Sequence, residues 1–145
     1  TADETVRNGY DRSPYEVGLG WVVNLDKGHF TGRKALMRET SRPIRRRLTK
    51  IVVDGNKPVG EAFVYNGKNG TRIGEVRCTI WSPVLKANLA LADIEYVKGK
   101  LPADLWARFD YQRELKWHTA WARCHAQSRP FYTPEHRSAT PPARF

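Results

Sequence analysis

The chain has 145 residues, of which 40% are apolar and 11% aromatic, so it can bury a sizeable core and is not chiefly disordered. It contains no run of the roughly 20 apolar residues that a membrane helix needs, and its two cysteines are too few for a disulfide framework or a four-cysteine zinc site. Because its start also lacks the layout of a secretory signal, we expect a soluble protein of a reducing compartment, the cytoplasm, without membrane contact.

The first forty residues predict loops, one strand and one helix. Residues 1–13 are polar and predict a loop, whereas the run 21–23 (Trp-Val-Val) favours a strand. The two glycines just before that run predict a close approach of the backbone to another segment or to a ligand. Thr31 is the expected N-cap of a helix that ends before Pro43.

Six short strands follow, separated by turn signals, at the spacing of a small barrel or sandwich. They are expected at residues 48–53, 61–65, 72–80, 88–96, 105–111 and 117–126. Small residues recur on the faces expected to point inward, as a tightly curved barrel requires. Both cysteines are therefore expected to be small core residues. The inward set is Val76, Cys78, Ile80, Ala90, Ala92, Ile94, Leu105, Ala107, Phe109, Tyr111, Ala122, Cys124 and Ala126.

These patterns divide the chain into three parts. Residues 1–42 form the end of one unit, residues 43–132 a compact β-barrel, and residues 133–145 an extended tail. Because the single methionine is Met37, we expect the chain to be a processed product or a portion of something longer.

A basic run lies ahead of the first barrel strand. Nine of the 25 Lys and Arg residues lie between Lys27 and Lys50, where Glu39 is the only acid, and the whole chain carries a net charge of +10. Such a run is either a solvated surface or an attractant for anions: a polyanionic small ligand, an acidic protein or nucleic acid. Nucleic acid is the least favoured of these, because the aromatic residues do not alternate with the bases of the run.

Few side chains form a recognisable catalytic pattern. The four histidines show no metal-ligand spacing, so no metal site is expected, and no nucleophile or phosphate loop identifies a catalytic residue. Glu16 could accept hydrogen bonds from the N–H groups of a ligand, or it could cap a local turn. Trp21 could stack on a flat ligand or belong to a core. Trp81 opens a Trp-Ser-Pro bend that could equally be a structural corner.

Several segments, in order, carry a family resemblance. Residues 13–21 (SPYEVGLGW), then LDK at 25–27 and FTGRKAL at 30–36, resemble the "TPxEAGLGW…LDK-x-F-x-G-x-EAL" stretch of the glycine-cleavage T-protein (aminomethyltransferase) family. Downstream, VYNG at 64–67, IGEV at 73–76 and WSPVLKANLALA at 81–92 are similar to its "VY-x-NG…IGEVTSGTFSPTLxKNIALA" stretch, and PFY at 130–132 to its closing residues.

The resemblance implies a tetrahydrofolate-dependent one-carbon transferase, of which this chain is the C-terminal part. The fold would be mainly β: a small C-terminal barrel of about six strands after a strand-helix remnant of an α+β folate-binding domain. Glu16, Trp21 and Trp81 would be the cofactor-binding residues. The catalytic groups would lie upstream, so the chain alone would be inactive. Expected partners are a small one-carbon donor, the missing N-terminal portion and a lipoyl carrier protein, and glutamate tails of folate would suit the basic run.

Departures from the family pattern leave other functions open. The family's arginine soon after "G-x-P" is replaced by Val59, and the strands around Trp106, Trp117 and Trp121 are more aromatic than usual. An O- or S-demethylase of the same family, acting on a small methylated substrate, is the first alternative. A basic, non-enzymatic barrel that binds an acidic protein or nucleic acid is the second. The sequence does not identify the donor or the oligomeric state.

Overall fold

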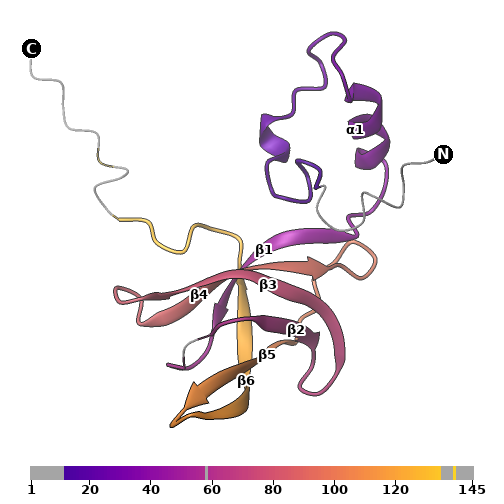
Figure 1. Ribbon diagram of the computed structural model, residues 1–145. Helices are drawn as coiled ribbons and strands as arrows, with labels where there is room; N and C mark the ends of the chain where they lie inside the picture. The colour runs from indigo at the N-terminus through magenta and orange to yellow at the C-terminus, as the bar shows by residue number, and fades with distance from the viewer. Residues whose placement is uncertain (1–11, 58, 135–138, 140–145) are drawn as a thin grey trace, which may run out of the picture.

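The fold consists of a small N-terminal segment above a six-stranded barrel, as Figure 1 shows. The computed structural model describes residues 12–57, 59–134 and 139. The predicted loop at 1–11 and most of the predicted tail at 133–145 therefore lie outside the described residues. None of the helices in the described part of the chain has the length and apolar character needed to cross a bilayer.

Two short helices precede the strands. A 3-10 helix η1 (Gly20–Val22) is followed by the α-helix α1 (Arg33–Thr40), and neither contains a buried residue. The strands are β1 (Arg46–Val53), β2 (Ala62–Asn66), β3 (Thr71–Ser82), β4 (Ala87–Glu95), β5 (Leu105–Arg113) and β6 (Lys116–Gln127).

The six strands close into a barrel in the order β1-β4-β3-β2-β5-β6, with every neighbouring pair antiparallel. The predicted barrel of about six strands is thus confirmed. Strand β1 closes it, because its whole length from Arg46 to Val53 pairs with β4 while only Lys50–Val53 pairs with β6. The first half of β1 therefore has one edge without a partner strand.

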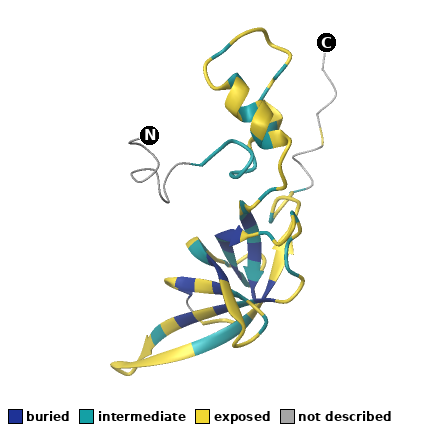
Figure 2. Cartoon of the chain, turned by 90° about the vertical axis from the view of Figure 1, so that its right-hand side faces the viewer, coloured by how far each residue is buried: buried dark blue, intermediate teal, exposed yellow. Residues whose placement is uncertain are grey.

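The core lies inside this barrel, where Figure 2 shows the buried positions gathered. Ile51, Val53, Val64 and Ile94 are its largest fully buried side chains. Alanines fill the narrow places between them, as a barrel of this size requires: Ala62, Ala90, Ala92 and Ala107. Gly74 serves the same end, since a Cβ there would lie 2.3 Å from the carbonyl oxygen of Asp93 on the neighbouring strand.

The inward faces of β4 and β5 agree with the alternation, but the predictions for the second half of β3 and for Ala126 near the end of β6, which is exposed, are wrong. Cys78 is exposed and Ile80 is 68% exposed, whereas both were expected in the core. The register between β3 and β4 shifts between Val76 and Cys78, which is the mark of a β-bulge. One extra residue turns every later side chain to the other face, so only Cys124 is a core cysteine.

Two expectations for the N-terminal segment are also wrong. Residues 21–23 do not form a strand, because η1 occupies Gly20–Val22 and a tight turn precedes it. The helix N-cap is Gly32, not Thr31, and it makes no side-chain cap bond. Its φ of 89° lies in the left-handed region that glycine adopts most easily, which explains why the chain enters the helix there.

The core makes a direct prediction about Ile51. Replacing Ile51 by Ala should lower the free energy of unfolding by about 2–5 kcal/mol, because it leaves a cavity at a fully buried site. Urea unfolding measures the change. Ile80→Ala on the exposed half of β3 is the matched control and should stay within about 0.5 kcal/mol of the parent. Equal losses in the two variants would show that the inward face is misassigned.

A second prediction concerns the buried thiol. Burial raises the pKa of Cys124 from 9.0 to about 12; nearby Asp54 also raises this pKa, and a backbone hydrogen bond from Ala107 lowers it. Above pH 9.0 the unfolded thiol loses its proton and the folded one keeps it, so this contribution to stability is complete below pH 9.0 and is lost as the pH rises toward 12. Unfolding free energies of the parent and Cys124→Ala, compared across this window, should converge as the pH rises. A constant difference would contradict the raised pKa.

Candidate functional site

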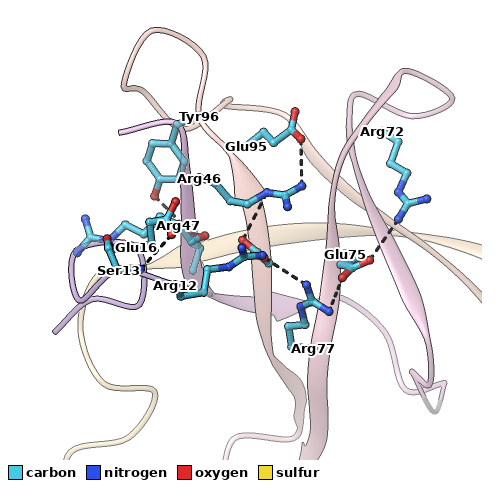
Figure 3. Close-up of polar contacts among 12 residues, drawn as sticks. Arg12, Ser13, Glu16, Arg46, Arg47, Arg72, Glu75, Arg77, Glu95 and Tyr96 are labelled. Carbon is cyan, nitrogen blue, oxygen red and sulfur yellow. Dashed lines mark hydrogen bonds and ion pairs between the residues drawn. The ribbon is translucent and has the colours of Figure 1, made fainter. Parts of the chain in front are cut away.

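The N-terminal segment meets the barrel along the first half of β1. The backbone N–H of Leu48 donates to the carbonyl oxygen of Glu16 at 2.7 Å, on the stretch of β1 that β6 does not reach. The N–H of Tyr96 donates to the carbonyl of Arg45, also at 2.7 Å, just before β1 begins. Figure 3 shows this junction, where the segment bearing Ser13 and Glu16 lies beside β1. Residues far apart in sequence therefore form one surface.

A buried carboxylate holds the junction together. Asp93 lies on β4 with only 4% of its side chain exposed, and three arginines from three different elements converge on it. Arg12 from the N-terminal segment bonds its Oδ2, Arg77 of β3 approaches the same oxygen at 3.4 Å, and Arg46 of β1 lies 3.7 Å from Oδ1. That Oδ1 atom is buried and, among the described residues, has no hydrogen-bond donor.

The ion pairs continue on both sides of Asp93, as the dashed lines in Figure 3 show. Glu75 lies 2.5 Å from Arg77 and 3.3 Å from Arg72, and Glu95 lies 3.0 Å from Arg46. Acids and bases alternate across β1, β4 and β3. Three carboxylates thus offset most of the charge of four arginines, which is typical of a structural network that fixes neighbouring strands and the segment resting on them.

A groove opens beside this junction, next to Glu16. Its volume is about 390 Å³, and two arginines and two glutamates line it together with apolar and aromatic side chains. The lining residues are Tyr15, Glu16, Glu39, Thr40, Arg42, Pro43, Ile44 and Arg45. The groove lies where the N-terminal segment, the end of α1 and the residues before β1 come together, so it exists only because the segment is docked.

Glu16 holds a local turn and also faces the groove. Its Oε2 accepts from the N–H of Ser13 at 3.2 Å, and the Ser13 hydroxyl accepts from the N–H of Glu16 at 3.2 Å. This reciprocal pair is a capping box, which Ser and Glu form at this spacing. The same hydroxyl donates to Glu39, which ties the turn to α1. The Oε1 atom of Glu16 has no hydrogen-bond partner among the described residues, so it can accept from a ligand.

The other two residues expected at a cofactor site lie elsewhere. Trp21 is on η1 and is 83% exposed, and Trp81 is near the end of β3 and is 44% exposed. Neither lines the groove beside Glu16. The two glycines ahead of Trp21 have separate reasons: Gly18 has φ of +77°, and a Cβ on Gly20 would lie 2.8 Å from the ring of Tyr15. The close approach predicted at Gly20 is therefore to another segment of the chain.

The basic run divides between these features. Arg46 belongs to the ion-pair network, whereas Arg42 and Arg45 line the groove. No group of three metal-ligating side chains occurs within residues 12–57, 59–134 and 139. Strand alternation assigns Asp93 to the outer face, so the sequence does not predict its burial; the side chains of Arg12, Arg46 and Arg77 gather on it there. The Ser13–Glu16 spacing, by contrast, was readable as a capping box.

Comparison with known proteins confirms the family resemblance. The chain is 38% identical over 80 residues to an aminomethyltransferase of Thermotoga sp. strain RQ2, covering 55% of this chain and 21% of that protein. It is 36% identical over 87 residues to one from Caldanaerobacter subterraneus subsp. tengcongensis, with 60% and 23% coverage. It is also 36% identical over 100 residues to one from Synechococcus sp. strain WH7803, with 66% and 26% coverage. No family model matches.

A solved structure shares the fold. The glycine cleavage system aminomethyltransferase T from Bartonella henselae aligns with a TM-score of 0.62 and 19% identity, over 84% of this chain and 32% of that one. The chain thus spans about a quarter of the length of its curated relatives and corresponds to their C-terminal part. The homologues indicate a C-terminal region like that of a glycine-cleavage T-protein.

The network makes a prediction about Asp93. Asp93→Asn should lower the free energy of unfolding by about 2–4 kcal/mol, because it leaves converging guanidinium groups without their buried countercharge. It should also speed amide exchange at Leu48, whose N–H is held by the docked segment. Urea unfolding and hydrogen exchange measure the two effects. Glu95→Gln, at a 58% exposed partner of Arg46, should cost no more than about 1 kcal/mol; an equal loss there would refute the special role of Asp93.

Proposed function

We propose that this chain is the C-terminal part of a tetrahydrofolate-dependent one-carbon transferase and that the groove beside Glu16 forms one wall of its folate site. The observation that carries the proposal is a half-buried carboxylate with an unpartnered oxygen, in a groove of about 390 Å³, on a chain similar to aminomethyltransferases. Small-molecule sites commonly have volumes of this order and place a few polar groups in an apolar surround.

The residues of the groove suit the chemistry of a folate. Oε1 of Glu16 can accept from ring N–H groups, and the half-buried side chains of Tyr15 and Ile44 offer apolar surface. Arg42 and Arg45 are exposed at the same groove and would pair with the carboxylates of a glutamate tail. The donors and acceptors of this chain therefore fit one side of the ligand.

Trp21 and Trp81 would add contacts beyond the groove. Their exposed indole rings are free to stack against a flat ring system or against protein from the upstream part. Their separate positions on η1 and β3 mean that a single ligand would reach both only if the upstream residues shape the space between them.

The reaction itself would depend on residues outside this chain. Tetrahydrofolate accepts a one-carbon unit on a ring nitrogen, and the protein must hold that nitrogen in line with the donor carbon. Here the chain would orient the cofactor and shield it from water, and the catalytic groups, the donor and any lipoyl carrier protein would meet upstream. On this proposal the chain alone is inactive, and the whole protein works in the cytoplasm.

One departure from the family pattern favours a demethylase as the second candidate. Val59 stands about where the family has an arginine near the active site, and the structure buries it at 7% exposure while its carbonyl accepts from the Thr79 hydroxyl at 2.5 Å. Because the side chain of Val59 belongs to the barrel core, this position presents no cation to a donor, and a donor that carries its methyl group on oxygen or sulfur needs none.

The proposal is tested with a chimera in which this chain replaces the matched C-terminal part of the Thermotoga sp. strain RQ2 aminomethyltransferase. Calorimetric titration should show saturable tetrahydrofolate binding, and Glu16→Gln should weaken it about tenfold, because a charge-assisted hydrogen bond becomes a neutral one. Glu114→Gln, at a side chain 82% exposed on the β5–β6 hairpin, is the control and should bind as the parent does.

Two results would overturn the proposal. A folded chimera without saturable binding would remove the folate site, and unchanged affinity in Glu16→Gln would remove Glu16 from it. Turnover by the 145 residues alone would contradict the assignment of the catalytic groups to an upstream part.

A further inference from the structure

A second cavity lies at the far end of the barrel, away from the Glu16 groove. The β5–β6 ladder runs on to Arg113 and Lys116, whereas β2 pairs with β5 only as far as the Ala62–Phe109 pair. The hairpin therefore projects past the start of β2, as Figure 1 shows. This notch has a volume of about 600 Å³ and is lined by residues 60, 61 and 63 on one side and 110–112 and 117 on the other.

The aromatic rings around the notch already attract cations of this chain. The Arg72 guanidinium lies 3.8 Å from the centroid of the Phe63 ring, and Lys57 Nζ lies 5.5 Å from that of Tyr111. Trp117 is different: it is 72% exposed and, among the described residues, has no ring or cation neighbour. Indole is the side-chain ring that binds cations best, so the strongest ring of the notch is the uncovered one.

The charged side chains of the notch also favour a cationic ligand. Glu61 lines it and has no hydrogen bond or ion pair with any described residue, and Asp110, held by the Thr119 hydroxyl at 2.6 Å, is the second carboxylate. No Lys or Arg belongs to the lining itself, and the two cations at its rim, Lys57 and Arg72, lie over the rings of Tyr111 and Phe63, not beside Trp117. Two carboxylates beside open aromatic surface form an environment complementary to an organic cation.

We propose that this notch binds a small alkylammonium ion, with a methylated, quaternary headgroup as the best fit. Such a headgroup combines a diffuse positive charge with apolar methyl groups, so the uncovered ring of Trp117 can cover it while Glu61 balances its charge. A compact, strongly hydrated metal ion would need more oxygen ligands than the notch supplies. The site uses neither Glu16 nor the junction, so its test is independent of the test of the folate proposal.

The test compares choline with its uncharged isostere 3,3-dimethylbutan-1-ol on the full chain. The two have nearly the same shape, so only recognition of charge distinguishes them. In a ¹⁵N-labelled sample, the indole N–H signal of Trp117, identified by its loss in Trp117→Phe, should shift saturably with choline and far less with the alcohol. Equal responses, or none, would overturn the proposal.

Three variants locate the site. Followed by the backbone amide signals of Gly60 and Gln112, which line the notch, Trp117→Ala should weaken choline binding about tenfold and Glu61→Gln about threefold. Gly60→Leu should abolish it, because a Cβ on Gly60 meets nothing within 4 Å and the longer side chain would fill the notch without disturbing the fold. Leu115→Ala, at the 90% exposed hairpin tip outside the notch, is the control and should bind normally.

The source of the headgroup is found by adding a trimethyllysine peptide to the same titration. Tighter binding of choline identifies a small metabolite as the occupant, as proposed. Tighter binding of the peptide, or unchanged affinity in Gly60→Leu, would overturn it.

Discussion

Closure of the barrel by β1 is the constraint on which the other features depend. β1 pairs with β4 along its whole length and with β6 along its second half, so the two ends of the sheet meet at this strand. A closed ring this small leaves little interior space, and the small side chains of the buried alanines at 62, 90, 92 and 107 fit into it. The junction lies where the first half of β1 has no β6 partner. The notch lies where β5 and β6 extend beyond the start of β2.

Asp93 converts a barrel surface into a platform for the preceding segment. Its carboxylate draws in guanidinium groups from the segment, from β1 and from β3, so one buried charge fixes three elements relative to one another. Buried ion pairs contribute more to specificity of arrangement than to raw stability in several systems. Here that specificity places the Ser13–Glu16 turn against α1 and so creates the groove that we assign to folate.

The six strands could be predicted because their alternation is regular and turn residues separate them, and Ala90, Ala92 and Ile94 lie inside as expected. The exposure of Cys78 could not be predicted, because a bulge moves every later residue of the strand to the other face and the apolar–polar alternation of the sequence does not reveal it. The burial of Asp93 cannot be predicted from local patterns, since the arginines that contact it come from other strands and from a segment some eighty residues away. The expected cofactor residues Glu16, Trp21 and Trp81 remain a prediction, and the notch at Trp117 arises from unequal strand lengths.

The half-strand of β1 that β6 leaves open has a further consequence. An exposed run of unpaired N–H and C=O groups is a template on which a foreign strand can add, and proteins cover such edges to remain monodisperse. The hydrogen bond from Leu48 to Glu16 places a non-strand segment over this edge. The Ser13–Glu16 turn, which we assign to ligand recognition, thereby also protects this edge, and its loss would allow β-strands of other molecules to pair with β1.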